Sequence, residues 1–364
     1  MRPGGRARAG AARNLLSGAL AAASAFALAG GAVRGQSAPS RPSSTVYSTT
    51  WTVTIVLPPR LVAGQPATLA VLGTDGKLAR NVAVDLGSGL QVRTDPIGRA
   101  YFTVPSGAKV LLAKSTGSST AALIDSASPP PASYALRMAP QVSIKDTATI
   151  CGGPFTGDAE ANAVQLGGEP ALVLAASPEC LVVLASPQAR PGRTQVTVRN
   201  SLGSFAAETT LVALADEPPQ PPLVAQKKSA LGVLAEGSAD PLRIHIHNET
   251  PGVLRFLRGD DQELTTSGGV PNAARFEVEA LRSGDFSFHA WIVPPASPAE
   301  AQLYLDAAIP IAGESFGKEL KKLSDQLRKH PKDAPKVAAR LDSMLNVVIA
   351  GDLRTLLAAA RNAL

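Results

Sequence analysis

Most of the chain alternates apolar and polar residues in short runs, which is the pattern of β-strands separated by turns. The stretch 163–200 shows it most clearly, with alternating apolar positions around the turns Gly167-Gly168 and Pro191-Gly192. These runs predict a mainly β protein. The other strand-like runs are 52–56, 66–72, 82–86, 92–104, 231–235, 242–247, 253–257, 274–280 and 286–293.

After Pro298 the apolar period changes from two residues to about 3.6, which predicts amphipathic helices. Ser297, Pro298 and Glu300 have the features of a helix start, with a serine cap, a proline at the first helical position and an acid in the first turn. We expect the apolar stripe of these helices to pack against neighbouring helices or the preceding domain, or to form an interaction surface for self-association. The residues of this stripe are Phe316, Leu320, Leu323, Leu327, Leu341 and Met344.

Proline-rich segments at 129–131, 218–222 and 294–295 divide the chain into regions that have the size of small domains. The predicted fold class is mainly β, with tandem Ig-like β-sandwiches followed by a C-terminal α-helical segment. The expected boundaries are 1–35 for a signal peptide, 36–47 for a linker, 48–127 for a first sandwich, 128–139 for a Pro-rich linker, 140–215 for a second sandwich, 216–228 for a second Pro-rich linker, 229–295 for a third sandwich and 296–364 for the helical region.

Two of these regions carry family-like motifs. Residues 140–214 contain a strand that ends in a Gly-Gly hairpin, a Pro-Ala-x-Val strand from Pro170, a Pro-Gly turn and a closing T-x-V-x-V strand from Thr194. This order resembles the immunoglobulin-like IPT/TIG domain. The run Thr94–Phe102 looks like the T-D-x-x-G-x-A-x-F signature of bacterial Ig-like domains and of transthyretin-like regulatory domains. The resemblance implies spacers and binding modules rather than enzymes.

The N-terminus has the pattern of a secretory signal peptide. Four arginines up to Arg13 precede an apolar run, 15–33, that contains no acid. Ala27-Leu28-Ala29 fits the cleavage rule and gives a mature start at Gly30, with a cut near Gly35 as the alternative. Gly and Ala dominate the run, which disfavours a retained membrane anchor. We therefore expect an exported protein in the periplasm, at the cell surface or outside the cell, without a transmembrane helix after cleavage.

Removal of this leader also changes the charge. The sequence has 35 Lys and Arg against 29 Asp and Glu, and five arginines lie at or before Arg34, which leaves 30 basic residues against 29 acids. A nearly neutral mature chain lacks the overall positive charge of a nucleic-acid-binding protein, so we expect no nucleic-acid partner. The abundance of Ala, Gly and Arg is typical of a bacterial protein.

The two cysteines, Cys151 and Cys180, both fall within the second predicted sandwich. An even pair inside one domain of an exported protein favours a disulfide, and two unpaired buried thiols are the alternative. A catalytic cysteine would need a basic partner, and this region contains no histidine.

Three histidines are the only candidates for a metal site. His245 and His247 alternate on one predicted strand, and His289 lies on another that is expected nearby. Because Ile244 and Ile246 would face the core, we expect both strand histidines to be exposed and without a metal. A calcium loop is also disfavoured, because its ligand spacing is not matched by Asp260, Asp261 and Glu263.

Enzyme motifs are otherwise missing from the sequence: there is no G-x-S-x-G, no H-E-x-x-H and no Walker or dinucleotide glycine loop. We therefore expect no catalytic residues and no cofactor. The sequence indicates a secreted or cell-envelope protein that presents Ig-like surfaces for adhesion or recognition of a protein or a polysaccharide. The alternatives are a non-catalytic accessory module of an extracellular carbohydrate-processing system, and a metal enzyme built on His245, His247 and His289.

Overall fold

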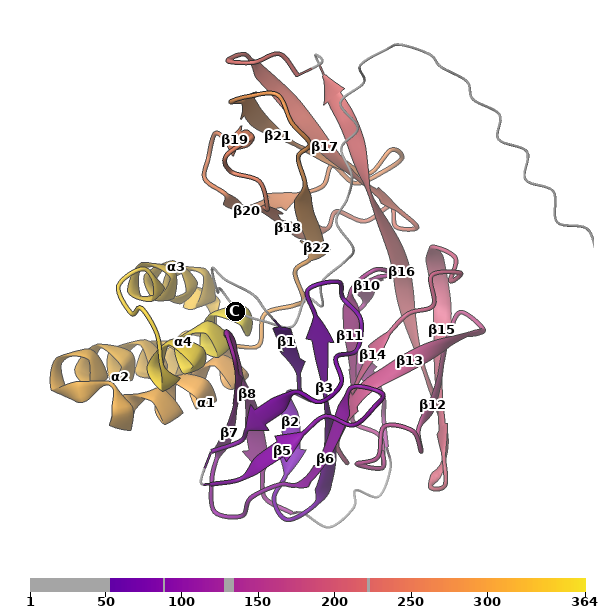
Figure 1. Cartoon of the computed structure of the whole chain (residues 1–364), viewed down its shortest axis with the longest axis vertical. Coiled ribbons are helices and arrows are strands. Elements are labelled where there is room, and N and C mark those ends of the chain that lie inside the picture. The colour runs from indigo at the N-terminus through magenta and orange to yellow at the C-terminus, as the bar shows by residue number, and fades with distance from the viewer. Residues whose placement is uncertain (1–52, 88, 128–133, 221–222) are drawn as a thin grey trace, which may run out of the picture. The chain divides into compact units, whose positions relative to one another are not determined.

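The computed structural model describes residues 53–87, 89–127, 134–220 and 223–364. It confirms the predicted fold class, because the described residues form strands from Val53 to Ile292 and helices from Pro298 onward (Figure 1). The predicted signal peptide, its cleavage site and the linker 36–47 lie outside the described residues. Among the residues that are described, no helix is long and apolar enough to cross a membrane.

The first sandwich has two facing groups of strands around a core of aliphatic side chains, of which Leu61 and Leu69 are fully buried. Asp95 of the Thr94–Phe102 motif stabilises a turn, because its carboxylate accepts hydrogen bonds from the backbone N–H groups of Ile97 and Arg99. One group is β1 (Val53–Val56), β3 (Pro66–Gly73) and β6 (Arg99–Thr103), and the other is β2 (Arg60–Val62), β8 (Ser118–Asp125), β7 (Val110–Ser115), β4 (Ala83–Asp85) and β5 (Gln91–Arg93).

The second sandwich contains the predicted Gly-Gly hairpin, in which Gly167 and Gly168 have φ values of 66° and 83° between β12 and β13. These angles are accessible to glycine without strain, which explains the pair. The strands are β9 (Arg137–Met138), β10 (Gln141–Ser143), β11 (Thr147–Cys151), β12 (Ala163–Leu166), β13 (Glu169–Ala176), β14 (Cys180–Leu184), β15 (Gly192–Asn200) and β16 (Gly203–Gln220).

The third sandwich has an aromatic centre, where the rings of Phe256, Phe276 and Phe288 pack in tilted and edge-to-face pairs. One sheet carries β17 (Lys228–Glu236), β21 (Ala273–Ala280) and β19 (Leu254–Phe256), and the other carries β20 (Asp261–Thr265), β18 (Arg243–Asn248) and β22 (Phe288–Ile292).

Strand β16 links the second and third sandwiches without a break. Its first half pairs with β15 and its second half with β17, so the predicted linker 216–228 instead begins inside a strand. The two prolines, Pro218 and Pro219, fall where the pairing register shifts between Glu217 and Gln220. A proline lacks the N–H that a ladder requires, and a bulge is where a strand tolerates it.

The first and second sandwiches share a joint that is both apolar and polar. Val56, Ala70 and Leu72 pack with Leu174 and Val182 in one buried cluster. This cluster extends the two separate cores across the boundary between the domains.

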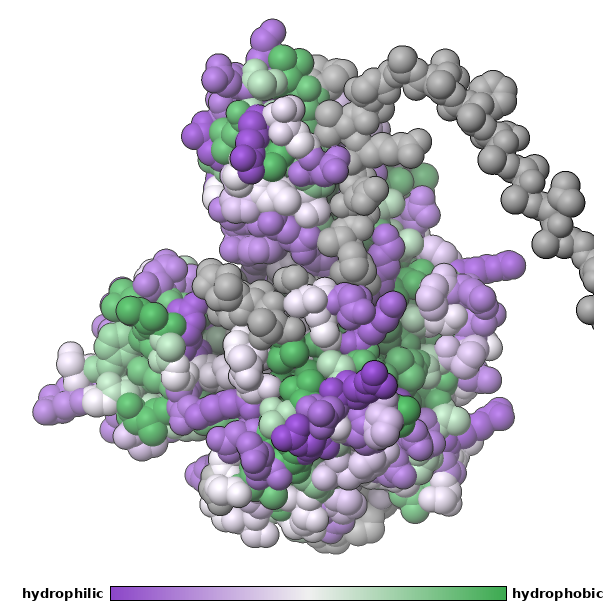
Figure 2. All heavy atoms as spheres, in the orientation of Figure 1, coloured by the Kyte–Doolittle hydropathy of each residue, from purple (hydrophilic) through white to green (hydrophobic). Residues whose placement is uncertain are grey.

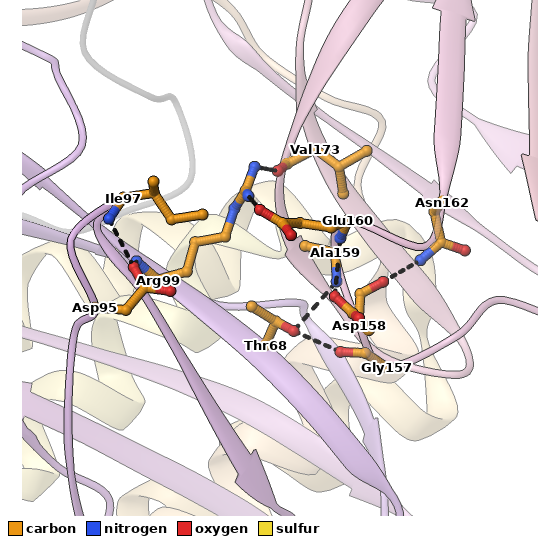
Figure 3. A network of polar contacts seen from close by, with 10 residues as sticks. All are labelled: Thr68, Asp95, Ile97, Arg99, Gly157, Asp158, Ala159, Glu160, Asn162 and Val173. Atoms are coloured by element: carbon orange, nitrogen blue, oxygen red, sulfur yellow. Dashed lines mark hydrogen bonds and ion pairs between the residues drawn. The ribbon is translucent and has the colours of Figure 1, made fainter.

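The polar part of the joint lies around Thr68 and Arg99 (Figure 3). The Thr68 hydroxyl donates to the carbonyl of Gly157 at 2.6 Å, and the guanidinium of the buried Arg99 donates to the carbonyl of Val173 at 2.6 Å and to the carboxylate of Glu160 at 3.1 Å. These bonds fix the loop 153–162 of the second sandwich against the first.

The C-terminal region forms α1 (Pro298–Ala308), α2 (Gly313–Lys329), α3 (Ala334–Leu345) and α4 (Asp352–Asn362), with 3-10 turns η1 (Ile309–Ile311) and η2 (Pro331–Asp333). Pro298 begins α1 as expected, although the Ser297 side chain makes no capping hydrogen bond. The predicted interaction stripe is not exposed: five of its residues are buried, and Phe316 packs partly buried against the same cluster.

The helices pack against one another, which was one of the expected arrangements, and their common core also includes residues of the first sandwich rather than of the preceding third one. Leu123 of β8 is buried in the helical cluster, and Val110, Leu112 and Ala121 pack against the same cluster. Along β8 the side chains alternate, so that the neighbours Ala122 and Ile124 lie in the sandwich core. The outer face of this sheet is thus apolar because helices cover it.

Cys151 and Cys180 form the predicted disulfide, and they lie directly opposite each other on β11 and β14. We expect the double variant Cys151→Ala/Cys180→Ala to lower the free energy of unfolding by about 3 kcal/mol, because the bond closes a loop in the unfolded chain. Urea unfolding of the variant and of the reduced wild type should give the same lowered midpoint. Equal midpoints for oxidised wild type and variant would contradict a stabilising disulfide.

Candidate functional site

One face of the sheet β20-β18-β22 carries a group of histidines, an acid and a tryptophan. Ile244 and Ile246 are fully buried in the core of the third sandwich, as predicted, so their neighbours on β18 face the other way. The strand register places His245 opposite Trp291, and His247 opposite Asp261 and His289. We call these five residues the histidine–tryptophan face: His245, His247, Asp261, His289 and Trp291.

The rings of this face are stacked. The centroid of the Trp291 ring lies 4.3 Å from that of His245 and 5.2 Å from that of His289, with both pairs close to parallel. His245 is therefore only 6% exposed, and the expectation of an exposed histidine is wrong for this residue. The sequence placed His245 on the outward face correctly but did not show that Trp291 covers it.

Asp261 joins the two histidines of β18. Its Oδ1 accepts from Nε2 of His245 at 3.1 Å and from Nδ1 of His247 at 2.8 Å. Burial alone would raise the pKa of Asp261, but these hydrogen bonds outweigh it and hold the pKa well below its ordinary value. The hydrogen bond to Asp261 also raises the pKa of His247, against the opposing effect of desolvation.

The geometry of these side chains differs from that of a metal site. Within the described part of the chain, no group of three or more His, Cys, Asp or Glu residues is placed to hold a metal ion. The three acids of the disfavoured calcium loop, Asp260, Asp261 and Glu263, each have a different hydrogen-bond partner. Asp260 accepts from Asn248 at 2.9 Å, Asp261 accepts from the histidines, and Glu263 accepts from Arg243 and Arg361.

The His247–Asp261 pair predicts a pH dependence of stability. Because the folded pKa of His247 is raised above 6.5, its contribution is fully present below pH 6.5 and is lost as the pH rises through the folded pKa. The lowered pKa of Asp261 gives a contribution that is present above pH 3.8 and is lost as the pH falls through the folded pKa.

We therefore expect the urea midpoint of the wild type to fall above pH 6.5, and we expect this fall to be smaller in His247→Gln. His330→Gln is the matched control, because His330 is exposed at the end of α2 and its replacement should preserve the wild-type profile. Identical pH profiles for wild type and His247→Gln would contradict the assignment.

A cavity of about 750 Å³ lies at the end of β22, with Ile292 and Pro294 in its wall; none of the five residues of the histidine–tryptophan face lines it. Its wall combines β11, the segment 137–143, the segment 292–297 and parts of α1 and α4. Asp146 belongs to the wall and is 3% exposed, and neither of its carboxylate oxygens has a hydrogen-bond partner. Sequence reasoning missed this residue, because an acid between two short strands is typical of an exposed turn.

Arg60, which also belongs to the wall, is by contrast strongly paired. Its guanidinium donates to Asp125 at 3.0 and 3.1 Å and to Glu300 of α1 at 3.1 Å. Desolvation lowers its pKa, but the two carboxylates together outweigh this effect and raise it. The positive charge of Arg60 is thus compensated within the protein.

No protein-family model matches the chain, and no curated protein is significantly similar to it. The extracellular region of plexin A4 is 12% identical over 66% of this chain and 22% of that one, with a TM-score of 0.25. A Bacteroides ovatus SGBP-B in complex with a mixed-linkage heptasaccharide is 12% identical over 64% and 72%, with a TM-score of 0.22. The N-terminal four Ig domains of Dscam1 isoform 1.9 are 11% identical over 68% and 70%, with a TM-score of 0.20.

The chain therefore aligns with about a fifth of the plexin structure. With TM-scores of 0.25 or less and identities of 11–12%, these likenesses identify no function for this chain.

Proposed function

We propose that this chain is an exported, non-catalytic binding protein that holds Ig-like surfaces in a fixed order for recognition of a protein or a polysaccharide. The observation that carries the proposal is the continuity between the sandwiches. The first and second share a buried cluster, and the second and third share strand β16. Domains joined in this way present several surfaces to one partner without an ordering cost on binding.

The state of the histidines supports a non-catalytic role. Nε2 of His245 and Nδ1 of His247 both donate to the same carboxylate, and the rings of His245 and His289 stack on Trp291. Such a face stabilises the packing of β18, β20 and β22. The leader pattern of the first 35 residues and the disulfide support export.

The surface supports recognition through mixed contacts. Apolar and polar residues are interspersed on the face shown in Figure 2. The exposed large apolar side chains include Leu172 on β13, Leu202 in the β15–β16 hairpin and Val270 in the β20–β21 connection. Non-obligate interfaces are about as apolar as the rest of a protein surface, so binding does not require a large apolar patch. The IPT/TIG-like motifs of residues 140–214 favour the second sandwich as a binding module.

The proposal is tested by measuring binding and turnover in the same samples. Purified chain from Gln36 to Leu364 is run by affinity electrophoresis through soluble polysaccharides, and is photo-crosslinked to intact bacterial envelopes. We expect saturable binding to one class of partner, with the partner recovered chemically unchanged. Recovery of a cleaved or modified partner would contradict a non-catalytic role, and absence of both retardation and crosslinks would contradict recognition.

A further inference from the structure

We propose that the cavity at the end of β22 binds a short neutral oligosaccharide, such as one end of a polysaccharide chain. The inference rests on the proposed function, because it selects a polysaccharide as the partner and places a binding site for it on the chain. Three features of the cavity carry the inference: free polar side chains on its wall, exposed prolines among them, and charged groups that are mostly compensated within the protein.

The free polar side chains of the wall come from different parts of the fold. Three lie on β9, β10 and β11, one precedes α1 and one ends α4. All are at least partly exposed, and none of them makes a hydrogen bond or an ion pair with the residues that the structure describes. They are Arg137, Gln141, Thr149, Ser297 and Asn362. Polar groups of this kind are satisfied by water or by a ligand, so a ligand can bond to them without disrupting the protein.

The strand register brings Arg137 and Thr149 to the same side of their sheet. Ala148 and Ile150 of β11 lie in the core of the second sandwich. Thr149 and Cys151 alternate with them and face away from this core. Arg137 lies directly opposite Cys151, which places it diagonally across from Thr149, about 7–8 Å away. One sugar unit can therefore contact the guanidinium and the hydroxyl together.

The chemistry of the wall suits hydroxyl groups. A sugar hydroxyl both donates and accepts, and the wall offers both functions, because the Arg137 guanidinium donates while the free amide and hydroxyl side chains do either. Pro140, Pro294 and Pro295 are exposed on the same wall and supply apolar surface for the C–H faces of a sugar ring. The volume of about 750 Å³ is within the range of about 300–1,000 Å³ that small-molecule sites occupy. A purely apolar ligand would leave the polar groups unsatisfied.

The charges of the wall favour a neutral sugar. The guanidinium of Arg60 is compensated by Asp125 and Glu300. The carboxylate oxygens of Asp146 are buried, so they do not reach a ligand. Arg137 is then the one charged side chain of the described wall without a charged partner, and its N–H groups can bind neighbouring hydroxyls in pairs. A strongly charged ligand would need a cluster of opposite charges, which these residues do not form.

The test is calorimetric titration and thermal unfolding of the full mature chain from Gln36 with the neutral trisaccharides maltotriose, cellotriose, xylotriose and triacetylchitotriose. We expect at least one of them to bind and to raise the melting temperature. Arg137→Ala should weaken this binding about tenfold and Thr149→Val about threefold, because a hydrogen bond from a charged donor contributes more than one from a hydroxyl. Arg258→Ala and Thr103→Val are matched controls at exposed positions outside the cavity wall, and they should bind like the wild type.

The melting temperature without sugar separates a binding role from a structural one. Because neither side chain bonds to the described part of the protein, Arg137→Ala and Thr149→Val should both melt like the wild type. A lowered melting temperature in both variants would assign the two side chains to folding instead. The inference is overturned if none of the trisaccharides binds, or if binding is unchanged in both variants. It is also overturned if a peptide of alternating valine and threonine binds where no sugar does, since the cavity would then accept an added strand.

Affinity electrophoresis of the double variant Arg137→Ala/Thr149→Val distinguishes failure of this inference from failure of the proposed function. Polysaccharide retardation that persists unchanged in the double variant would overturn this site but leave recognition to another surface of the chain. A wild type that shows neither retardation nor crosslinks would contradict both. Retardation that is lost in the double variant alone would support both.

Discussion

Replacement of Leu123 by aspartate is expected to detach the helical region from the first sandwich. Leu123 is 3% exposed and lies in the cluster formed by the four helices, so the variant would bury a carboxylate among aliphatic side chains. The lost burial and the unpaired charge together should cost about 4 kcal/mol of the free energy of unfolding. Because the face of β8 that the helices cover would then be exposed, the protein should also self-associate.

Limited proteolysis and light scattering measure this outcome. The variant should be cleaved within residues 296–364 at protease concentrations that leave the wild type intact, and it should form oligomers. Leu172→Asp is the matched control, because Leu172 is 44% exposed on β13 and its replacement should change neither property. Unchanged protease resistance in Leu123→Asp would show that the helices are held by other contacts.

Replacement of Gly157 by alanine is expected to open the joint between the first and second sandwiches. A Cβ at this position would lie 1.9 Å from the carbonyl oxygen of Pro66, a backbone atom that moves only if β3 moves. The hydrogen bond from the Thr68 hydroxyl to the Gly157 carbonyl would be lost with the displacement. We expect a loss of about 3 kcal/mol, since overpacking against backbone is relieved only by separating the two surfaces.

Urea unfolding and small-angle scattering of Gly157→Ala check this prediction. A lower midpoint with a larger radius of gyration would show that the sandwiches separate while each remains folded. Gly252→Ala is the control, because its Cβ would meet only the end of the flexible Arg282 side chain at 3.6 Å. A radius of gyration equal to that of the wild type would mean that the joint does not depend on this close approach.

The variant Gly157→Ala also bears on the proposed function. If a partner binds across more than one sandwich, Gly157→Ala should weaken its binding although the outer surfaces are unchanged. If the partner binds to a single sandwich, its affinity for Gly157→Ala should equal its affinity for the wild type. The comparison therefore identifies how many domains the partner contacts before the contact residues are known.

The sequence by itself determined the local structure. Alternating apolar residues identified many of the strands but missed β2, β7, β8, β11, β16 and β20. The period of 3.6 identified the helices, and Ile244 and Ile246 were correctly placed in the core. The pairing of Cys151 with Cys180 also followed from two cysteines within one domain. These features depend on a few neighbouring residues, whose side-chain direction follows from backbone geometry alone.

Only the tertiary structure decided which surface covers each apolar or charged face. The helical stripe is buried against helices and β8 of the first sandwich, and Pro218 lies in a strand because β17 pairs on either side of it. The burial of His245 depends on Trp291, and the buried Asp146 lies 3.5 Å from His289, which is far away in the sequence. Periodicity shows that a face must be covered, but the covering residues lie tens to hundreds of positions away, and their choice depends on the packing of the whole chain.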